Sequence, residues 1–238
     1  MAADGSSSNE ILADPAAQIL HPSRCGSRYV IFSWRFHGDT KSRNLWRANL
    51  DGSNPVKLTD VDSRFPVCSP DGKWVYFENY TASQVWRVLT DGSAKAEFVP
   101  GTVLPQTFLP NSRPALSPDG KVLAVMLGTR LFENMKPENK IALINLDSAS
   151  PARVVPADLR IGFFGLFTAD GKALAYAIRE NGIDNVWVQP LDGSPGKKIT
   201  NFDSEQIDDM QLSPDGKTLG LLRFHSDSDV VLLQETKP

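Results

Sequence analysis

The stretch from Cys68 to Ser93 reads CSPDGKWVYFENYTASQVWRVLTDGS and decides the fold. It contains two apolar, strand-like segments, with a Ser-Pro-Asp-Gly turn in front of them and a Thr-Asp-Gly turn behind. Proline presets φ at the second turn position, Asp accepts hydrogen bonds from nearby backbone N–H groups, and Gly takes the positive φ that reverses the chain. The stretch therefore predicts antiparallel strands bounded by tight turns.

The Ser-Pro-Asp-Gly turn recurs along the chain. It returns at 117–120 and 213–216, with a looser copy at 168–171 and a degraded copy at 23–26. The turn glycines, at positions 26, 72, 120, 171 and 216, are 45 to 51 residues apart. Each unit has room for four antiparallel strands. A fixed period of this size predicts the blades of a β-propeller.

A second signature follows the first in most units. Trp46, Trp86 and Trp187 each precede an Asp-Gly turn and a short strand by a few residues. The combination of Ser-Pro-Asp-Gly-Lys, Trp, Asp-Gly-Ser and Leu/Ile-Thr resembles the TolB-like, WD-related (PD40) β-propeller repeat. The resemblance implies a bacterial setting, where similar propellers are envelope proteins or sensory parts of membrane-anchored kinases and regulators. A β-sandwich with similar turns is the alternative, but it does not explain their fixed order.

We therefore expect a single all-β domain over residues 1–238, a propeller of five four-stranded blades. Residues 9–13 are expected to supply the outer strand of the last blade and so close the ring, which removes free sheet edges. The alternative is a piece of a propeller with more blades. The five repeats are expected at 18–59, 63–99, 112–155, 161–200 and 207–233.

Composition excludes some classes of partner. The formal net charge is −3, so no bulk attraction to nucleic acid or to an anionic membrane is expected. No apolar run reaches transmembrane length. We expect a monomer with a protein or peptide partner. A cytoplasmic location is expected if Met1 is the true start, and a periplasmic one if the chain is the C-terminal part of a longer exported or membrane-anchored protein.

The candidate binding residues lie in the variable loops. In a four-stranded meander the regular turns share one face, and the irregular loops and blade-to-blade links share the other. Function concentrates on loops that a rigid scaffold holds, so the second face is the predicted binding face. Its charges are expected either to line the mouth of the central channel or to form a solvated rim: Arg35, His37, Arg43, Asp60, Asp62, Arg64, Arg113, Arg160, Asp208 and Asp209.

Catalytic and metal-binding motifs are not recognisable in the sequence. There is no G-x-S-x-G nucleophile elbow. His21, His37 and His225 lack partners at metal-ligand spacing and are expected to be solvated or structural. Cys68 occupies an apolar repeat position, and nothing in the repeat brings it to Cys25, so no disulfide is expected.

The sequence thus predicts a protein that is not an enzyme and has no cofactor or metal. Its expected function is to present loops to a protein, peptide or glycan. The alternative is a propeller hydrolase of the lactonase type with a divalent ion in the central channel. Asp60, Asp208 and Asp209 are the carboxylates with which such a site could begin.

Overall fold

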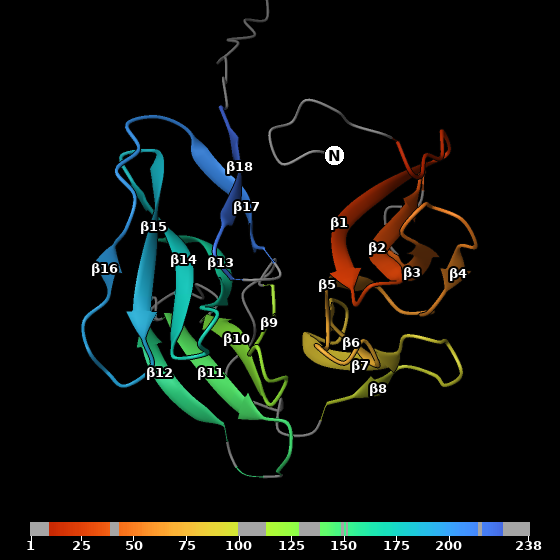
Figure 1. Ribbon diagram of the computed structural model, residues 1–238, viewed down its shortest axis with the longest axis horizontal. Helices are drawn as coiled ribbons and strands as arrows, with labels where there is room; N and C mark the ends of the chain where they lie inside the picture. Colours follow the sequence, from red (N-terminus) through yellow and green to blue (C-terminus); the bar gives the residue numbers. More distant parts are fainter. Residues whose placement is uncertain are drawn as a thin grey trace, which may run out of the picture.

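The chain folds into a ring of antiparallel sheets (Figure 1). The computed structural model describes residues 10–38, 43–99, 113–128, 139–148, 150, 152–213 and 216–225. Within these residues there is no helix, and hence none long and apolar enough to cross a membrane. The predicted all-β propeller architecture is confirmed, with four complete four-stranded blades and two described strands of a fifth.

Each complete blade is a meander whose strands pair in chain order. Blade 1 contains β1 to β4, blade 2 contains β5 to β8, blade 3 contains β9 to β12, blade 4 contains β13 to β16, and blade 5 contains β17 and β18. The bounds are β1 Ala17–Cys25, β2 Tyr29–Phe36, β3 Asn44–Asn49, β4 Val56–Lys57, β5 Ser63–Cys68, β6 Trp74–Asn79, β7 Gln84–Leu89, β8 Glu97–Phe98, β9 Ala115–Leu116, β10 Val122–Gly128, β11 Asn139–Asn145, β12 Arg153–Ala157, β13 Ile161–Phe167, β14 Ala173–Glu180, β15 Ile183–Pro190, β16 Lys197–Lys198, β17 Gln206–Leu212 and β18 Leu219–Phe224.

The turns behave as their residues predict. In the turn of blade 2, the N–H of Gly72 donates to the carbonyl of Ser69 over 2.8 Å, and Gly72 has a φ of 71°. The Asp71 carboxylate accepts hydrogen bonds from the Ser69 hydroxyl and from the Lys73 N–H. The same bonds recur around Asp119 and Asp170, because each turn has a hydroxyl residue, Ser or Thr, two positions before the Asp and a Lys two positions after it.

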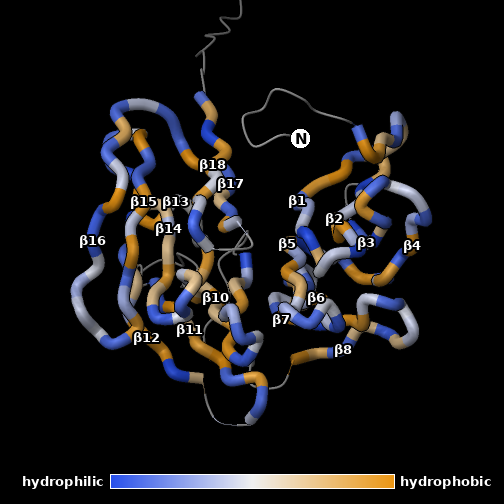
Figure 2. The backbone as a smooth tube through the Cα atoms, in the orientation of Figure 1, coloured by the Kyte–Doolittle hydropathy of each residue, from blue (hydrophilic) through white to orange (hydrophobic). Residues whose placement is uncertain are grey.

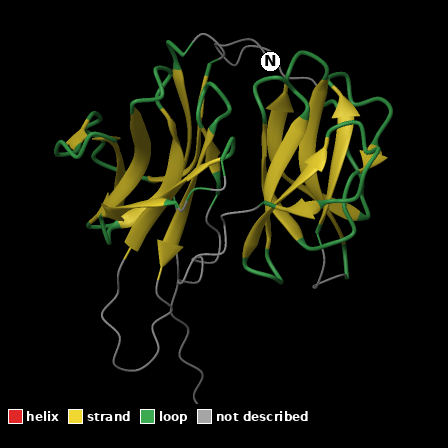
Figure 3. Cartoon of the chain, turned by 90° about the horizontal axis from the view of Figure 1, so that it is seen from below, coloured by secondary structure: helices red, strands yellow, loops and turns green. Residues whose placement is uncertain are grey.

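The core lies between neighbouring blades. One buried cluster joins blades 3 and 4 around Leu174 and Ile141, and another joins blades 1 and 2 around Ile31 and Phe77. Hydrophobic residues follow the strands in Figure 2, as expected for sheets that face one another. Figure 3 shows the same sheets after a quarter turn, with loops gathered at the two ends of the strands. The flat faces of the ring are therefore made of loops and turns.

The innermost strands surround the centre in chain order: β1 contacts β5, β5 contacts β9, β9 contacts β13, and β13 contacts β17 (Figure 1). Residues 10–13 are not in a strand, and the carbonyl O of Ile11 lies against Gly52, in the turn between β3 and β4. Asn9 and the expected last strand after residue 225 lie outside the described residues. The division into repeats and the closure by residues 9–13 stay predictions.

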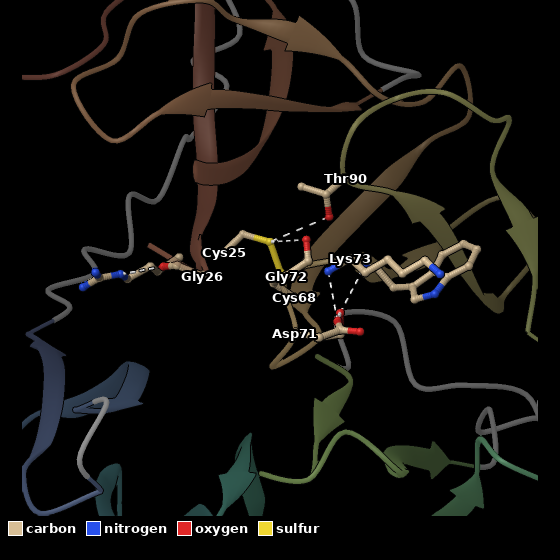
Figure 4. Close-up of a disulfide and its surroundings, with 10 residues drawn as sticks. Cys25, Gly26, Cys68, Asp71, Gly72, Lys73 and Thr90 are labelled. Atoms are coloured by element: carbon tan, nitrogen blue, oxygen red, sulfur yellow. Dashed lines mark hydrogen bonds between the residues drawn. A yellow bond between two sulfur atoms is a disulfide. The ribbon is translucent and has the colours of Figure 1, made fainter. Parts of the chain in front are cut away.

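The cysteines correct an expectation. Cys25 and Cys68 form a disulfide that ties the end of β1 to the end of β5 (Figure 4). The sulfur of Cys25 also contacts the carbonyl of Gly72 and the hydroxyl of Thr90, both at 3.8 Å. The expectation was wrong because the repeat pattern relates equivalent positions of different blades and does not show how one blade packs against the next. The two cysteines are brought together by the packing of one inner strand against the next.

Candidate functional site

Irregular pairing marks the innermost strands. β1 has a bulge between Leu20 and Ser23, β5 has one between Arg64 and Val67, and β17 has one between Ile207 and Asp209. β13 has two such irregularities. A bulge leaves a residue outside the ladder and re-aims its side chain. Four of the five inner strands therefore depart from regular pairing near the centre of the ring.

His21 and Phe65 stand at equivalent places in the first two bulges. Each has a φ of 52°, in the left-handed region that non-glycine residues seldom occupy, and each precedes a proline. Their rings lie 4.2 Å apart between centroids. Residues held in such backbone conformations concentrate at functional sites, so this pair marks the centre of the ring as a candidate site.

Arg113 and Asp209 bring two further inner strands to the same place. Arg113 lies two residues before β9, and its guanidinium donates two hydrogen bonds to the Asp209 carboxylate, at 2.6 and 3.0 Å. Both side chains are largely buried, with 13% and 24% of their surface exposed. Two parallel bonds fix the orientation of both groups more strictly than a single contact does.

A cavity of about 380 Å³ occupies the centre of the ring. Its volume is within the range of small-ligand pockets. Its walls are mostly apolar, and Arg113 is the charged side chain among its lining residues. Every innermost strand contributes to the lining, through Ser23 of β1, Pro66 of β5, Ala115 of β9, Phe167 of β13 and Met210 of β17.

Positive charge predominates around His21. Burial lowers the pKa of His21 from 6.5 to about 4, and the charges of Arg113, Arg43 and Arg64 contribute to this lowering, against an opposing effect of Asp209. His21 is therefore a neutral imidazole at physiological pH. Its Nδ1 atom is buried without a hydrogen-bond partner among the described residues. The three guanidinium groups give the surroundings of this neutral imidazole a positive charge that favours an anionic ligand.

Two of these arginines are tied to one carboxylate. Arg64 donates to Asp62 through Nη2 at 3.1 Å and Nε at 3.4 Å, and the backbone N–H of Arg43 donates to the same Asp62 at 3.3 Å. The Arg64 guanidinium lies 3.3 Å from the centroid of the Tyr80 ring. Burial and the charge of Arg64 lower the pKa of Arg43. We name His21, Arg43, Arg64, Arg113 and Asp209 the central cluster.

The other predicted site residues lie outside the central cluster. Asp60 is exposed and pairs with Lys57 at 2.7 Å, while Arg160 is exposed and pairs with Asp158 at 2.7 Å. His37 and Asp208 are exposed, the latter within the bulge of β17. Arg35 bonds to Gln18 on the neighbouring strand. Of the predicted residues, the geometry brings together Arg43, Asp62, Arg64, Arg113 and Asp209.

The sequence reasoning missed His21 and Phe65. The sequence does mark the position of Phe65. Phe65, Arg113 and Asp209 each stand four residues before the serine of a Ser-Pro-Asp-Gly turn, and this common spacing places them at equivalent positions in their blades. His21 has no such turn after it and is aligned with Phe65 only by the strand pairing. A proline also follows this position in three blades, at His21-Pro22, Phe65-Pro66 and Arg113-Pro114.

A divalent metal does not fit the central cluster. Within the described ranges, no three His, Cys, Asp or Glu side chains are placed to bind one ion. Asp209 is engaged by Arg113, Asp60 lies on the exposed rim, and the surrounding arginines repel a cation. The three aspartates from which a lactonase-type site could begin do not converge. The arginines around His21 outnumber the carboxylates that pair with them, so the site has an excess of positive charge.

No family model and no curated protein sequence matches the chain. The TolB-like assignment therefore stays a prediction. Among solved structures, the chain is similar to an oligogalacturonate lyase from Vibrio parahaemolyticus, with 14% identity and a TM-score of 0.65, covering 87% of this chain and 60% of that one. It is also similar to an oligogalacturonate lyase in complex with manganese, with 15% identity, a TM-score of 0.60, and 87% and 59% of the two chains covered. A structure of a nidogen/laminin complex matches with 16% identity, a TM-score of 0.63, and 90% and 74% covered.

These similarities correct the expectation that the chain is not an enzyme. Prolyl endopeptidase and acylaminoacyl peptidase are also among the similar structures, so propellers of this fold occur repeatedly within enzymes. The missing nucleophile motif was weak grounds for excluding catalysis, because a propeller site is assembled from separate blades and not from one contiguous motif. At these identities the likeness shows the fold, and the chain spans about 60% of the length of the lyase. What the comparisons show is that the chain is an all-β propeller whose solved relatives in fold include lyases and peptidases.

Proposed function

We propose that this chain is the propeller part of an enzyme that acts on a carboxylate-bearing oligosaccharide of the uronate type. The single observation that carries the proposal is the neutral His21 imidazole within the electrostatic reach of three arginines, one of which, Arg113, lines the apolar central cavity. Two of the similar structures are oligogalacturonate lyases, and this supports a uronate oligosaccharide as the class of substrate. The central cluster supplies the two kinds of group that such a reaction needs, a base and cations.

Binding of the substrate carboxylate is assigned to the arginines. Arg43, Arg64 and Arg113 place positive charge around His21, and two of them already have a partly compensating carboxylate. A uronate carboxylate adds the negative charge that the cluster lacks. Charge-assisted hydrogen bonds from guanidinium to carboxylate are strong and directional.

The proton-transfer step is assigned to His21. A bound carboxylate offsets the arginine charges and raises the pKa of His21 from about 4 toward its ordinary value, which makes the imidazole a better base once the substrate is present. The imidazole takes the proton from the carbon next to the carboxylate. The C–O bond to the neighbouring sugar breaks, a C=C bond forms, and the departing oxygen takes a proton from solvent.

The test is the ultraviolet absorbance of unsaturated product formed from oligogalacturonates. We expect His21→Gln to lower kcat by about 100-fold or more, the usual contribution of a general base. Arg113→Gln should raise KM. Arg160→Gln is the matched control and should change neither value, because Arg160 pairs with Asp158 on the exposed rim. The proposal is refuted if the protein neither binds nor cleaves these oligosaccharides, or if His21→Gln is as active as the unchanged protein.

A protein partner remains a second candidate function. The expectation came from the loop-bearing face, and the likeness to a propeller in a nidogen/laminin complex supports it. Phe36, Leu222 and Phe224 are apolar side chains that expose 37% to 57% of their surface. A pull-down with Phe36→Ser and Leu222→Ser as paired variants tests this candidate separately from the central cluster.

A further inference from the structure

Glu78 is an unusual residue for its position. It lies in β6, only 3% of its surface is exposed, and its Oε2 atom is buried with no hydrogen-bond partner among the described residues. Buried carboxylates are ordinarily paired, because burying a charge without a partner is costly. In the equivalent place by strand register, blade 1 has Ser33 and blade 3 has Met126. Because other blades have a hydroxyl or an apolar side chain at this position, the packing of the blade does not require a carboxyl group at residue 78.

The neighbours of Glu78 connect it to the central cluster. Glu78 is the cross-strand partner of Arg64, the arginine that binds Asp62 and lowers the pKa of His21. On its other side it is paired with Val85, which belongs to the apolar cluster between blades 2 and 3. The charged groups that act on Glu78 are Arg64 and Asp62 of the β5 segment, while β7 and the facing β10 contribute apolar residues to that cluster.

We propose that Glu78 is a positioning residue that sets the charge of the central cluster through Arg64 and thereby controls the affinity for an anionic ligand. When the carboxyl group is protonated, Arg64 is shared only with Asp62 and its charge is available to the ligand. When it is ionised, a second carboxylate competes for Arg64, and the cluster carries one more negative charge.

The control acts near neutral pH. Burial raises the pKa of Glu78 from 4.5 to about 7, against an opposing effect of Arg64, while Asp62 contributes to the rise. His21, with a pKa of about 4, does not titrate in the same range. Affinity for an anion should therefore fall as pH rises through 7. This inference rests on the proposed function for its ligand but not for its test.

The first measurement is the binding of trigalacturonate by calorimetry at about pH 5.5 and pH 8.5, on either side of the Glu78 pKa. We expect roughly fivefold to tenfold weaker binding at the higher pH for the unchanged protein. Glu78→Gln, which keeps the shape and removes the charge, should bind equally at both. Glu97→Gln is the matched control, because Glu97 lies on exposed β8 and pairs with Arg87; this variant should keep the pH dependence.

The second measurement needs no ligand. The imidazole NMR signals of His21 should show an inflection near pH 7, as Glu78 ionises and redistributes Arg64, and Glu78→Gln should abolish it. An inflection that survives in Glu78→Gln, or none in the unchanged protein, overturns the inference. Failure of trigalacturonate to bind at any pH, with the inflection present, refutes the proposed substrate class and leaves the role of Glu78 intact.

Discussion

Arg113 and Asp209 are 96 residues apart in sequence and are joined by two hydrogen bonds of 2.6 and 3.0 Å. The pair links the segment that enters blade 3 to the inner strand of blade 5. It therefore ties together blades that are not neighbours in the chain. It also brings one positive and one negative charge to bear on His21 of blade 1.

The first prediction concerns the charge balance at His21. Arg113→Gln removes a positive charge that lowers the pKa of His21, so this pKa should rise from about 4 by about one unit. Asp209→Asn removes the opposing negative charge and should lower it. NMR titration of the imidazole measures both. Arg160→Gln should leave the value unchanged, and a rise as large in Arg160→Gln as in Arg113→Gln would show that His21 senses only the net charge of the protein.

The second prediction concerns stability and pH. The pKa of Glu78 is raised in the folded state, from 4.5 to about 7, so the folded protein holds the Glu78 proton more tightly than the unfolded chain does. This difference contributes fully to the free energy of unfolding below about pH 4.5, and the contribution is lost as pH rises through 7. The loss amounts to about 3 kcal/mol. Glu78→Gln should therefore be more stable than the unchanged protein at about pH 8.5 and nearly equal at about pH 5. Urea unfolding at the two values measures this difference, and a constant offset at both would show that ionisation of Glu78 is not its cause.

The third prediction concerns the disulfide. Cys25 and Cys68 close a loop with a sequence separation of 43 residues between two inner strands. Cys25→Ser together with Cys68→Ser should lower the free energy of unfolding by about 2–4 kcal/mol. Reduction of the unchanged protein should have a similar effect and should not affect the double variant. If reduction destabilises both proteins equally, the effect comes from the reductant and not from this bond.

The fourth prediction concerns the wall of the central cavity. A Cβ atom on Gly165 of β13 would lie 2.2 Å from the carbonyl O of Ala175 and 2.8 Å from the sulfur of Met210. Gly165→Ala should therefore cost about 1–3 kcal/mol or more, because the overlap involves backbone. Gly220→Ala is the control, since its nearest contact would be the carbonyl O of Gln211 at 3.7 Å. Thermal unfolding of both variants compares them directly.

Much of the fold could be predicted from the sequence, because it is encoded locally and repeatedly. The Asp71 turn contains its own hydrogen-bond partners, so its conformation can be read from five residues. The central cluster could be predicted only in part. Arg64 and Arg113 were found as charges near inner strands, but the bulge that aims His21 depends on the pairing of β1 with β2. The Cys25–Cys68 bond depends on the packing of one blade against the next.

One position on the inner segment of the blades separates the residues that the repeat needs for folding from a residue that it can vary. Phe65, Arg113 and Asp209 share this position by their distance from the repeat turn, and His21 shares it by strand pairing, so four blades present an imidazole, a phenyl ring, a guanidinium and a carboxylate there. None of them belongs to the turns or to the buried clusters between blades. Duplication of a blade can therefore copy the scaffold, while single substitutions at this one position assign each copy a different chemical role. A change of ligand during evolution then requires few mutations and no new fold.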